Sequence, residues 1–361
     1  MQNTLFPADD EAQHPGSGKS AGGGAGAVAK PTMLPKKPGQ PRATTVLPHP
    51  AEPEVVALAH ALSPRIRLGT SSWSYPGWAG MVWHQPYADS MLSRHGLTAY
   101  AAHPLFRAVS VDKGFYKPLS VLEYARFAAA VPSDFRFVVK APSVVTDALV
   151  RDKEGRGKQL NPAFLNPDIA VSEFVQPAID GLGEKIGALV FQLSPLPMPM
   201  LANPQPLLER LATLLHALPA LRPLAPDGVI AVEVRDPQLL GQALANVLRK
   251  AGATFCLGLH AKMPTIESQL PMLRALWPGP LVCRWNLNPL NGAYGYEDAR
   301  DLYAPYDRLV DIDLPTRESL ARVANAAARA GHPVYITVSN KAEGSAPLSV
   351  RGLAETLCAA C

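Results

Sequence analysis

From about Arg65 onward, short apolar or β-branched runs alternate with longer segments of helical periodicity. The runs predict eight strands, because buried parallel strands read as nearly continuous hydrophobic stretches. The leucines of 207–218 mark one helical face, and Ser120 with Glu123 forms a capping box that opens a helix ended by Pro132. Further helices are predicted over 237–252 and 316–331. The predicted strands are 66–70, 108–112, 135–140, 188–193, 229–235, 254–259, 281–286 and 334–338.

This alternation defines an α/β fold, and a single (β/α)₈ TIM-type barrel over residues 63–361 explains it best. Two doubly wound halves are disfavoured, because no glycine-rich dinucleotide fingerprint follows the first strand. Residues 1–62 are rich in Pro, Gly and Ala, and Phe6 is their one aromatic residue. We therefore predict that they form a disordered tail.

Composition narrows the class of protein without naming a function. The chain is 47% hydrophobic and 18% charged, which is typical of a folded globular protein. It contains no apolar run long enough to cross a bilayer and no signal peptide, so we expect a cytoplasmic protein with no membrane partner. Four cysteines are too few for a disulfide scaffold, and a net charge of +4 does not favour a nucleic-acid partner.

Polar side chains interrupt the predicted strands near their carboxyl ends. Because strand residues alternate between two faces, the members of each pair two apart lie on one face. Burying an unpaired charge costs several kcal/mol, so these groups must pair with one another or border a pocket at the C-terminal face of the barrel. They are Ser110 and Asp112, Lys140, Gln192, Glu233 and Arg235, and Arg284 and Asn286.

Two interpretations of these polar residues remain open. In one, an ion-pair network such as Glu233 with Arg284 or Lys140 merely plugs the barrel. In the other, a ligand is held there: Glu233 transfers a proton with Asp112 as the second carboxylate, and Lys140 acts as an electrostatic stabiliser. Arg235 and Arg284 would then neutralise an anionic ligand.

Aromatic residues gather after the first two predicted strands, in Trp73, Tyr75 and Trp78 and in Phe115 and Tyr116. They could wall a pocket mouth, since aromatic rings stack on sugars and bases, or form a loop that packs on itself. Metal ligands are scarce, because among the nine histidines only His260 follows a strand directly. We predict no metal site, name no cofactor, and interpret 151–158 as a solvated loop that could act as a lid.

Six motifs follow one another along the chain: Gly69-Thr70-Ser71-Ser72-Trp73, Phe115-Tyr116, Phe135-Arg136-Phe137-Val138-Val139-Lys140, Phe191-Gln192-Leu193, Val232-Glu233-Val234-Arg235 and Asn340-Lys341-Ala342-Glu343-Gly344. In this order they resemble the YecE-like family, also called domain of unknown function 72. The similarity runs from about 65 to 357 and implies a TIM-type barrel but no particular reaction. It also adds Asn340 to the candidate substrate-binding residues.

Two departures from the family pattern affect the predicted chemistry. Ser110 stands where the family has a glutamate, and Asn286 stands where it has a histidine. We therefore expect either an enzyme that acts on a small anionic substrate by general acid–base chemistry with Asp112 and Glu233, or a non-catalytic barrel that binds a ligand or docks a partner. A slight positive balance near the strand ends favours a small anion, such as a phosphorylated sugar or nucleotide fragment. The oligomeric state is not predicted.

Overall fold

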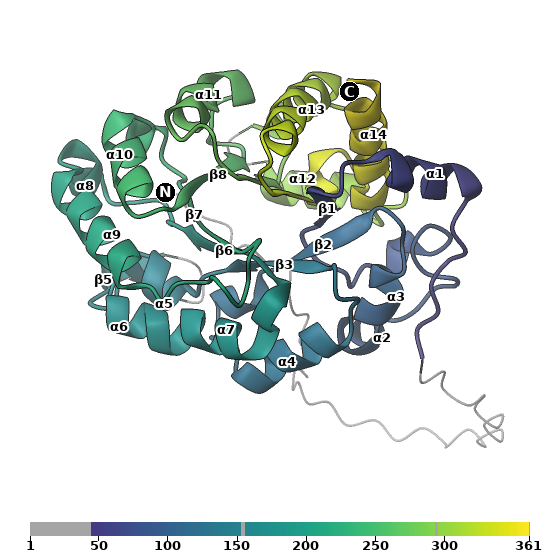
Figure 1. Ribbon diagram of the computed structural model, residues 1–361, viewed down its shortest axis with the longest axis horizontal. Helices are drawn as coiled ribbons and strands as arrows, with labels where there is room; N and C mark the ends of the chain where they lie inside the picture. Colours follow the sequence, from purple (N-terminus) through teal and green to yellow (C-terminus); the bar gives the residue numbers. More distant parts are fainter. Residues whose placement is uncertain (1–44, 153–155, 293–294, 361) are drawn as a thin grey trace, which may run out of the picture.

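Eight parallel strands close into a barrel surrounded by helices, as Figure 1 shows. The structure is a computed structural model and describes residues 45–152, 156–292 and 295–360. The strand order around the barrel is β1, β10, β9, β8, β7, β6, β3, β2, so each strand lies beside its neighbour in sequence once the hairpin β4–β5 is set aside. The predicted fold class is confirmed. The barrel strands are β1 Ile66–Thr70, β2 Phe106–Val111, β3 Arg136–Lys140, β6 Ile186–Gln192, β7 Val229–Glu233, β8 Thr254–Leu259, β9 Leu281–Trp285 and β10 Val334–Val338.

The helices also follow the predicted pattern with one correction. The capping box of Ser120 and Glu123 opens α4 at Val121. The predicted helix over 237–252 is instead a 3₁₀ turn at Pro237–Leu239 followed by α10, because Leu240 and Gly241 adopt extended backbone angles between them. The α-helices are α1 Pro53–Ala61, α2 Asp89–His95, α3 Leu97–Ala101, α4 Val121–Ala129, α5 Ser143–Thr146, α6 Pro167–Ala170, α7 Gln176–Leu182, α8 Met198–Ala202, α9 Gln205–Ala217, α10 Gln242–Lys250, α11 Ile266–Ala275, α12 Tyr296–Tyr303, α13 Leu314–Arg329 and α14 Ala346–Ala359.

Two segments differ from the sequence-based prediction. The segment expected to be a solvated loop carries an antiparallel hairpin of β4 Leu149–Arg151 and β5 Gly157–Leu160, strands too short to show a clear periodicity. The predicted tail overlaps the described residues at 45–62, and these pack on the barrel: Val55 and Ala59 of α1 are buried, and α1 contacts α14. Residues 1–44 lie outside the described part of the chain.

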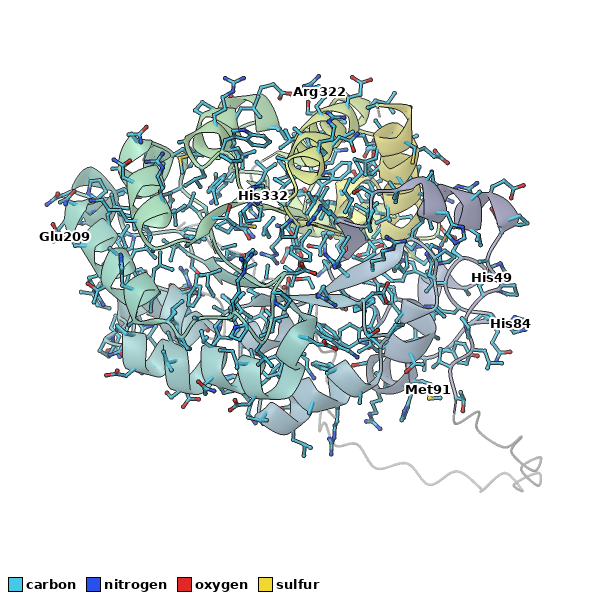
Figure 2. All side chains as sticks on the ribbon, in the orientation of Figure 1. His49, His84, Met91, Glu209, Arg322 and His332 are labelled. Atoms are coloured by element: carbon cyan, nitrogen blue, oxygen red, sulfur yellow. The ribbon has the colours of Figure 1, made fainter. Side chains whose placement is uncertain are left out.

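Side chains fill the barrel interior, as the sticks in Figure 2 illustrate. The strands contribute a cluster of buried side chains to the middle of the barrel. At the amino ends of the strands, Asp227 accepts ion pairs from Arg67 at 2.8 Å and from Arg136 at 3.4 Å. These contacts close that end, so the carboxyl ends are where a pocket can form. The interior cluster comprises Val138, Ala188, Val190, Ala231, Cys256, Val282 and Tyr335.

Gly69 permits the close approach of β1 and β2. A Cβ atom at this position would lie 1.8 Å from the carbonyl oxygen of Ala108, its partner in the neighbouring strand. Because β1 also pairs with β10, a displaced β1 would open the barrel. The backbone cannot yield here without breaking strand hydrogen bonds.

We expect Gly69→Ala to lower the free energy of unfolding by roughly 3 kcal/mol or more, because it forces overpacking against backbone atoms. Gly241→Ala is the matched control, since a Cβ there meets no atom within 4 Å and the backbone is extended. It should change stability by less than about 1 kcal/mol. Urea denaturation of both variants measures the difference, and equal stabilities would contradict the proposed close approach.

Candidate functional site

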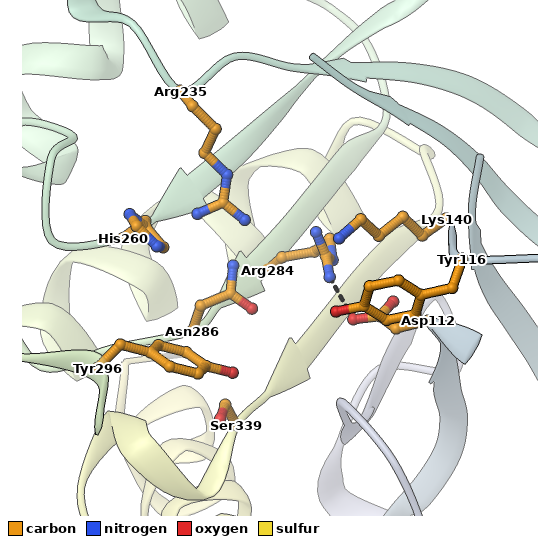
Figure 3. A pocket seen from close by; sticks show the side chains of 9 residues that line it. All are labelled: Asp112, Tyr116, Lys140, Arg235, His260, Arg284, Asn286, Tyr296 and Ser339. Carbon is orange, nitrogen blue, oxygen red and sulfur yellow. Dashed lines mark hydrogen bonds and ion pairs between the residues drawn. The ribbon is translucent and has the colours of Figure 1, made fainter. Parts of the chain in front are cut away.

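A polar pocket lies at the carboxyl ends of the barrel strands (Figure 3). Its volume is about 390 Å³ with open solvent at the mouth included, so it suits a small ligand. The residues that line it come from six strand ends, from the 3₁₀ turn after β2 and from the start of α12: Asp112, Tyr116, Lys140, Arg235, His260, Arg284, Asn286, Tyr296 and Ser339.

Arg284 is the centre of a buried ion-pair network below this pocket. Its Nη2 lies 2.5 Å from Asp112 Oδ2, and its Nη1 donates to Glu233 Oε2 at 2.7 Å and to Gln192 Oε1 at 2.8 Å. Burial lowers the pKa of Arg284, but the charges of Asp112 and Glu233 outweigh this effect and raise the pKa well above its usual value. Arg284 is therefore a permanent cation.

Glu233 joins a second arginine to the network. Arg235 Nη2 donates to Gln192 Oε1 at 2.7 Å and lies 3.0 Å from Glu233 Oε1. Gln192 and Glu233 are register partners in β6 and β7, so their side chains emerge side by side. Glu233 is completely buried and does not border the pocket, since both of its oxygens face guanidinium groups. The ion pair foreseen between Glu233 and Arg284 is present, with a pocket above it.

Three donor atoms of the pocket find no acceptor among the residues that the structure describes. Arg235 is 6% exposed and Asn286 is 8% exposed, and both line the pocket. Arg235 Nε and Nη1 and Asn286 Nδ2 are buried without a hydrogen-bond partner within residues 45–152, 156–292 and 295–360. Leaving a buried donor unsatisfied costs about 1–3 kcal/mol, so such groups call for an explanation. An acceptor-bearing ligand would provide one.

Asp112 is the one carboxylate among the described residues that line the pocket. Ser110 Oγ donates to its Oδ1 at 2.7 Å, and Arg284 binds its Oδ2. Two separate contacts therefore fix the orientation of this carboxylate at the pocket wall. Ser110 itself is buried and supports Asp112 from below.

Buried lysines lie against aromatic rings near the pocket. Lys140 is 2% exposed, and its Nζ lies 3.7 Å from the ring centroid of Phe115. Lys341 Nζ lies 4.1 Å from the ring centroid of Tyr296. Tyr116 packs edge-on against Phe115, so Phe115 supports the pocket while Tyr116 lines it.

The remaining aromatic candidates and Asn340 are not among the lining residues. Trp78 is fully buried and donates through Nε1 to Asn340 Oδ1 at 3.1 Å. The same oxygen accepts from the backbone nitrogen of Ala346 at the start of α14. Trp73 packs edge-on against Phe127, and Tyr75 lies against Trp78 with ring centroids 4.8 Å apart. These contacts attach the loop after β1 to the barrel.

Three lining residues were absent from the predicted set: His260, Tyr296 and Ser339. His260 directly follows β8 and entered the sequence analysis as a candidate metal ligand, whereas Tyr296 opens α12 in the long segment after β9. Ser339 was detectable, because it lies just past β10 and two residues after the buried Thr337. The position of Tyr296 in the pocket could not be predicted, because no local sequence pattern shows how the segment after β9 returns to the barrel.

Other charges near the strand ends are paired outside the pocket. Asp147 binds Arg151 at 2.5 Å and Glu343 binds Arg317 at 2.7 Å. The pocket and the network below it then hold the cations Lys140, Arg235 and Arg284 against two carboxylates, a surplus of one positive charge. In the part of the chain that the structure describes, no cluster of three potential metal-ligating side chains occurs.

The fold and the pocket define the class: a TIM-type barrel with a polar pocket at the carboxyl ends of its strands. Within this class, the chain belongs to the family described as protein of unknown function DUF72, whose model matches residues 67–360. The resemblance inferred from the motifs is thereby confirmed. None of the helices in the described ranges is long and apolar enough to cross a bilayer.

Solved structures of the same family share the fold. A DUF72 family protein from Enterococcus faecalis is 17% identical with a TM-score of 0.52, and the alignment covers 81% of this chain and 95% of that chain. A DUF72 family protein from Thermotoga maritima is 19% identical with a TM-score of 0.51, covering 81% of this chain and 98% of that chain. No curated protein matches the chain.

The network predicts the effect of removing the Glu233 charge. Glu233→Gln leaves two buried guanidinium groups close together without the carboxylate between them, so we expect a loss of about 3–5 kcal/mol in the free energy of unfolding. Glu355→Gln is the control, because Glu355 is 58% exposed in its pair with Arg351 and should contribute less than about 1 kcal/mol. Chemical denaturation of both variants tests this, and equal stabilities would exclude a structural role for Glu233.

Proposed function

We propose that the protein binds a small metabolite through an anionic group, phosphoryl or carboxylate, in the pocket at the carboxyl ends of the strands. The single observation that carries this proposal is the set of buried donors without acceptors, on Arg235 and Asn286. Charge-assisted hydrogen bonds from a guanidinium to an oxyanion are among the strongest in proteins. The oxygens of a single anionic group would accept hydrogen bonds from these donors.

Electrostatics supports the same assignment. Lys140, Arg235 and Arg284 outnumber Asp112 and Glu233, and all three cations are buried at the pocket. A singly charged anion would bring this cluster to neutrality. Because charges interact more strongly in a buried site than in water, the gain is larger here than at the surface.

A second candidate function is acid–base catalysis on the bound anion, with Asp112 as the proton-transferring group. Asp112 borders the pocket, whereas Glu233 lies beneath it with both oxygens against arginines. A general acid or base must reach the proton that it transfers. The geometry therefore favours Asp112 over Glu233 for this role, with Lys140 beside the reacting group as an electrostatic stabiliser.

Calorimetric titration tests anion binding directly. We expect wild-type protein to bind inorganic phosphate or glycerate, and Arg235→Met to weaken binding by about 10- to 100-fold, the value of a hydrogen bond to a charged group. Arg235→Lys, which keeps the charge but loses the planar donor array, should be intermediate.

Arg322→Met serves as the matched control, because Arg322 lies on α13 at the molecular surface (Figure 2) with its side chain 64% exposed. The affinity of this variant for anions should equal that of the wild type. Binding of neutral sugars alone, or unchanged anion affinity in both Arg235 variants, would refute the proposed function.

A further inference from the structure

The two sides of the pocket differ in hydrogen-bonding character. Arg235 and Asn286, just past strands β7 and β9, have unsatisfied atoms that are all donors. Strand β2 lies across the barrel from β8 and is followed by Asp112, whose carboxylate oxygens accept hydrogen bonds. Figure 3 shows Arg235 and His260 at one side of the pocket, with Asp112, Tyr116 and Lys140, whose Nζ lies against the Phe115 ring, at the other. A ligand that satisfies both sides must carry an acceptor at one end and donors at the other.

Asp112 cannot be a site for the anionic end of a ligand. The permanent cation Arg284 pairs with it at 2.5 Å, and Ser110 orients it through its other oxygen. Each carboxylate oxygen has a second lone pair suited to a hydroxyl donor. A second anion placed here would be repelled, because like charges a few ångströms apart are strongly unfavourable in a buried site.

Hydroxyl groups complete the wall between the two ends. Tyr116, Tyr296 and Ser339 come from three separate segments, and each offers a hydroxyl that both donates and accepts. In Figure 3 the tyrosine hydroxyls approach the middle of the pocket from opposite directions, above Ser339. Such a wall matches the hydroxyls of a ligand better than an apolar chain, which offers these groups no hydrogen bond.

We infer that the ligand is a hydroxylated anion: a phosphorylated or carboxylated sugar or polyol. Its anionic group binds Arg235 and Asn286, and its hydroxyls donate to Asp112 and bind Tyr116, Tyr296 and Ser339. This assignment rests on the proposed anion binding and adds a specificity to it. A plain oxyanion would satisfy only the donor side and leave Asp112 facing no donor from the ligand.

Matched probe pairs test this assignment on the wild-type protein. Glycerol 3-phosphate and n-propyl phosphate share a chain length and a phosphoryl group and differ only in hydroxyls, and glycerate and propionate form the corresponding carboxylate pair. We expect the hydroxylated member of one pair to bind at least about 10-fold more tightly in calorimetric titration, because its hydroxyls form hydrogen bonds that the other member lacks. The pair that shows the difference identifies the anionic group.

Two variants locate the specificity. Tyr116→Phe removes one hydroxyl from a side chain that is 50% exposed, so the fold should persist. We expect it to weaken glycerol 3-phosphate or glycerate several-fold and to leave n-propyl phosphate or propionate unchanged. Tyr306→Phe, which alters a tyrosine that does not line the pocket, is the control and should change neither affinity.

The outcomes separate this inference from the proposed function. Equal affinity for both members of each pair, with binding that still depends on Arg235, would overturn the hydroxylated class and leave anion binding intact. No binding of any anionic probe would overturn both.

Discussion

The ion pairs of Arg284 with Asp112 and Glu233 determine how the polar side chains are arranged at the carboxyl ends of the barrel strands. A guanidinium buried at 3% exposure requires compensating charge, and it receives two carboxylates at 2.5 and 2.7 Å. Both oxygens of Glu233 are therefore engaged by arginines, and Asp112 is held in one orientation at the pocket wall. Gln192 Oε1 accepts a hydrogen bond from Arg284 and another from Arg235. This one amide oxygen therefore bridges the two guanidinium groups. The two arginines and two carboxylates sum to zero charge, so Lys140 supplies the positive surplus of the site above.

Much of this organisation was predictable from the sequence, because it follows from the strand period. Residues at Ser110 and Asp112, Glu233 and Arg235, and Arg284 and Asn286 alternate with hydrophobic neighbours, and alternation directs each pair into the barrel. The depth of each side chain below the pocket was not predictable in the same way. Glu233 and Arg235 are only two residues apart, yet Glu233 lies beneath the pocket and Arg235 borders it. A step of two residues along a strand moves a side chain by about 7 Å, enough to change its role from network member to pocket lining.

Loops limited the prediction for a different physical reason. Three of the five tryptophans follow β1, and their density is compatible with both a stacking surface and a packed loop. The structure buries Trp78 against Asn340, a contact that joins residues 262 positions apart and leaves no local signature. Tyr296 reaches the pocket from α12, within an excursion whose course depends on long-range packing such as the hydrogen bond of Tyr303 with Asp311. Local patterns predicted which residues are in the strands, but not which loop residues contact one another.

The separation of Glu233 from Asp112 also bears on what the two family departures do to the site. Ser110 carries a hydroxyl where the family resemblance implies the carboxylate of a glutamate. This hydroxyl donates to Asp112 at 2.7 Å, whereas a glutamate would add a second negative charge beside it. Asn286 brings an uncharged donor to the opposite wall, where a histidine would titrate. At both positions the side chain present is therefore an uncharged hydrogen-bonding group. Under the proposed acid–base function, proton transfer falls to Asp112, whose orientation Ser110 and Arg284 hold.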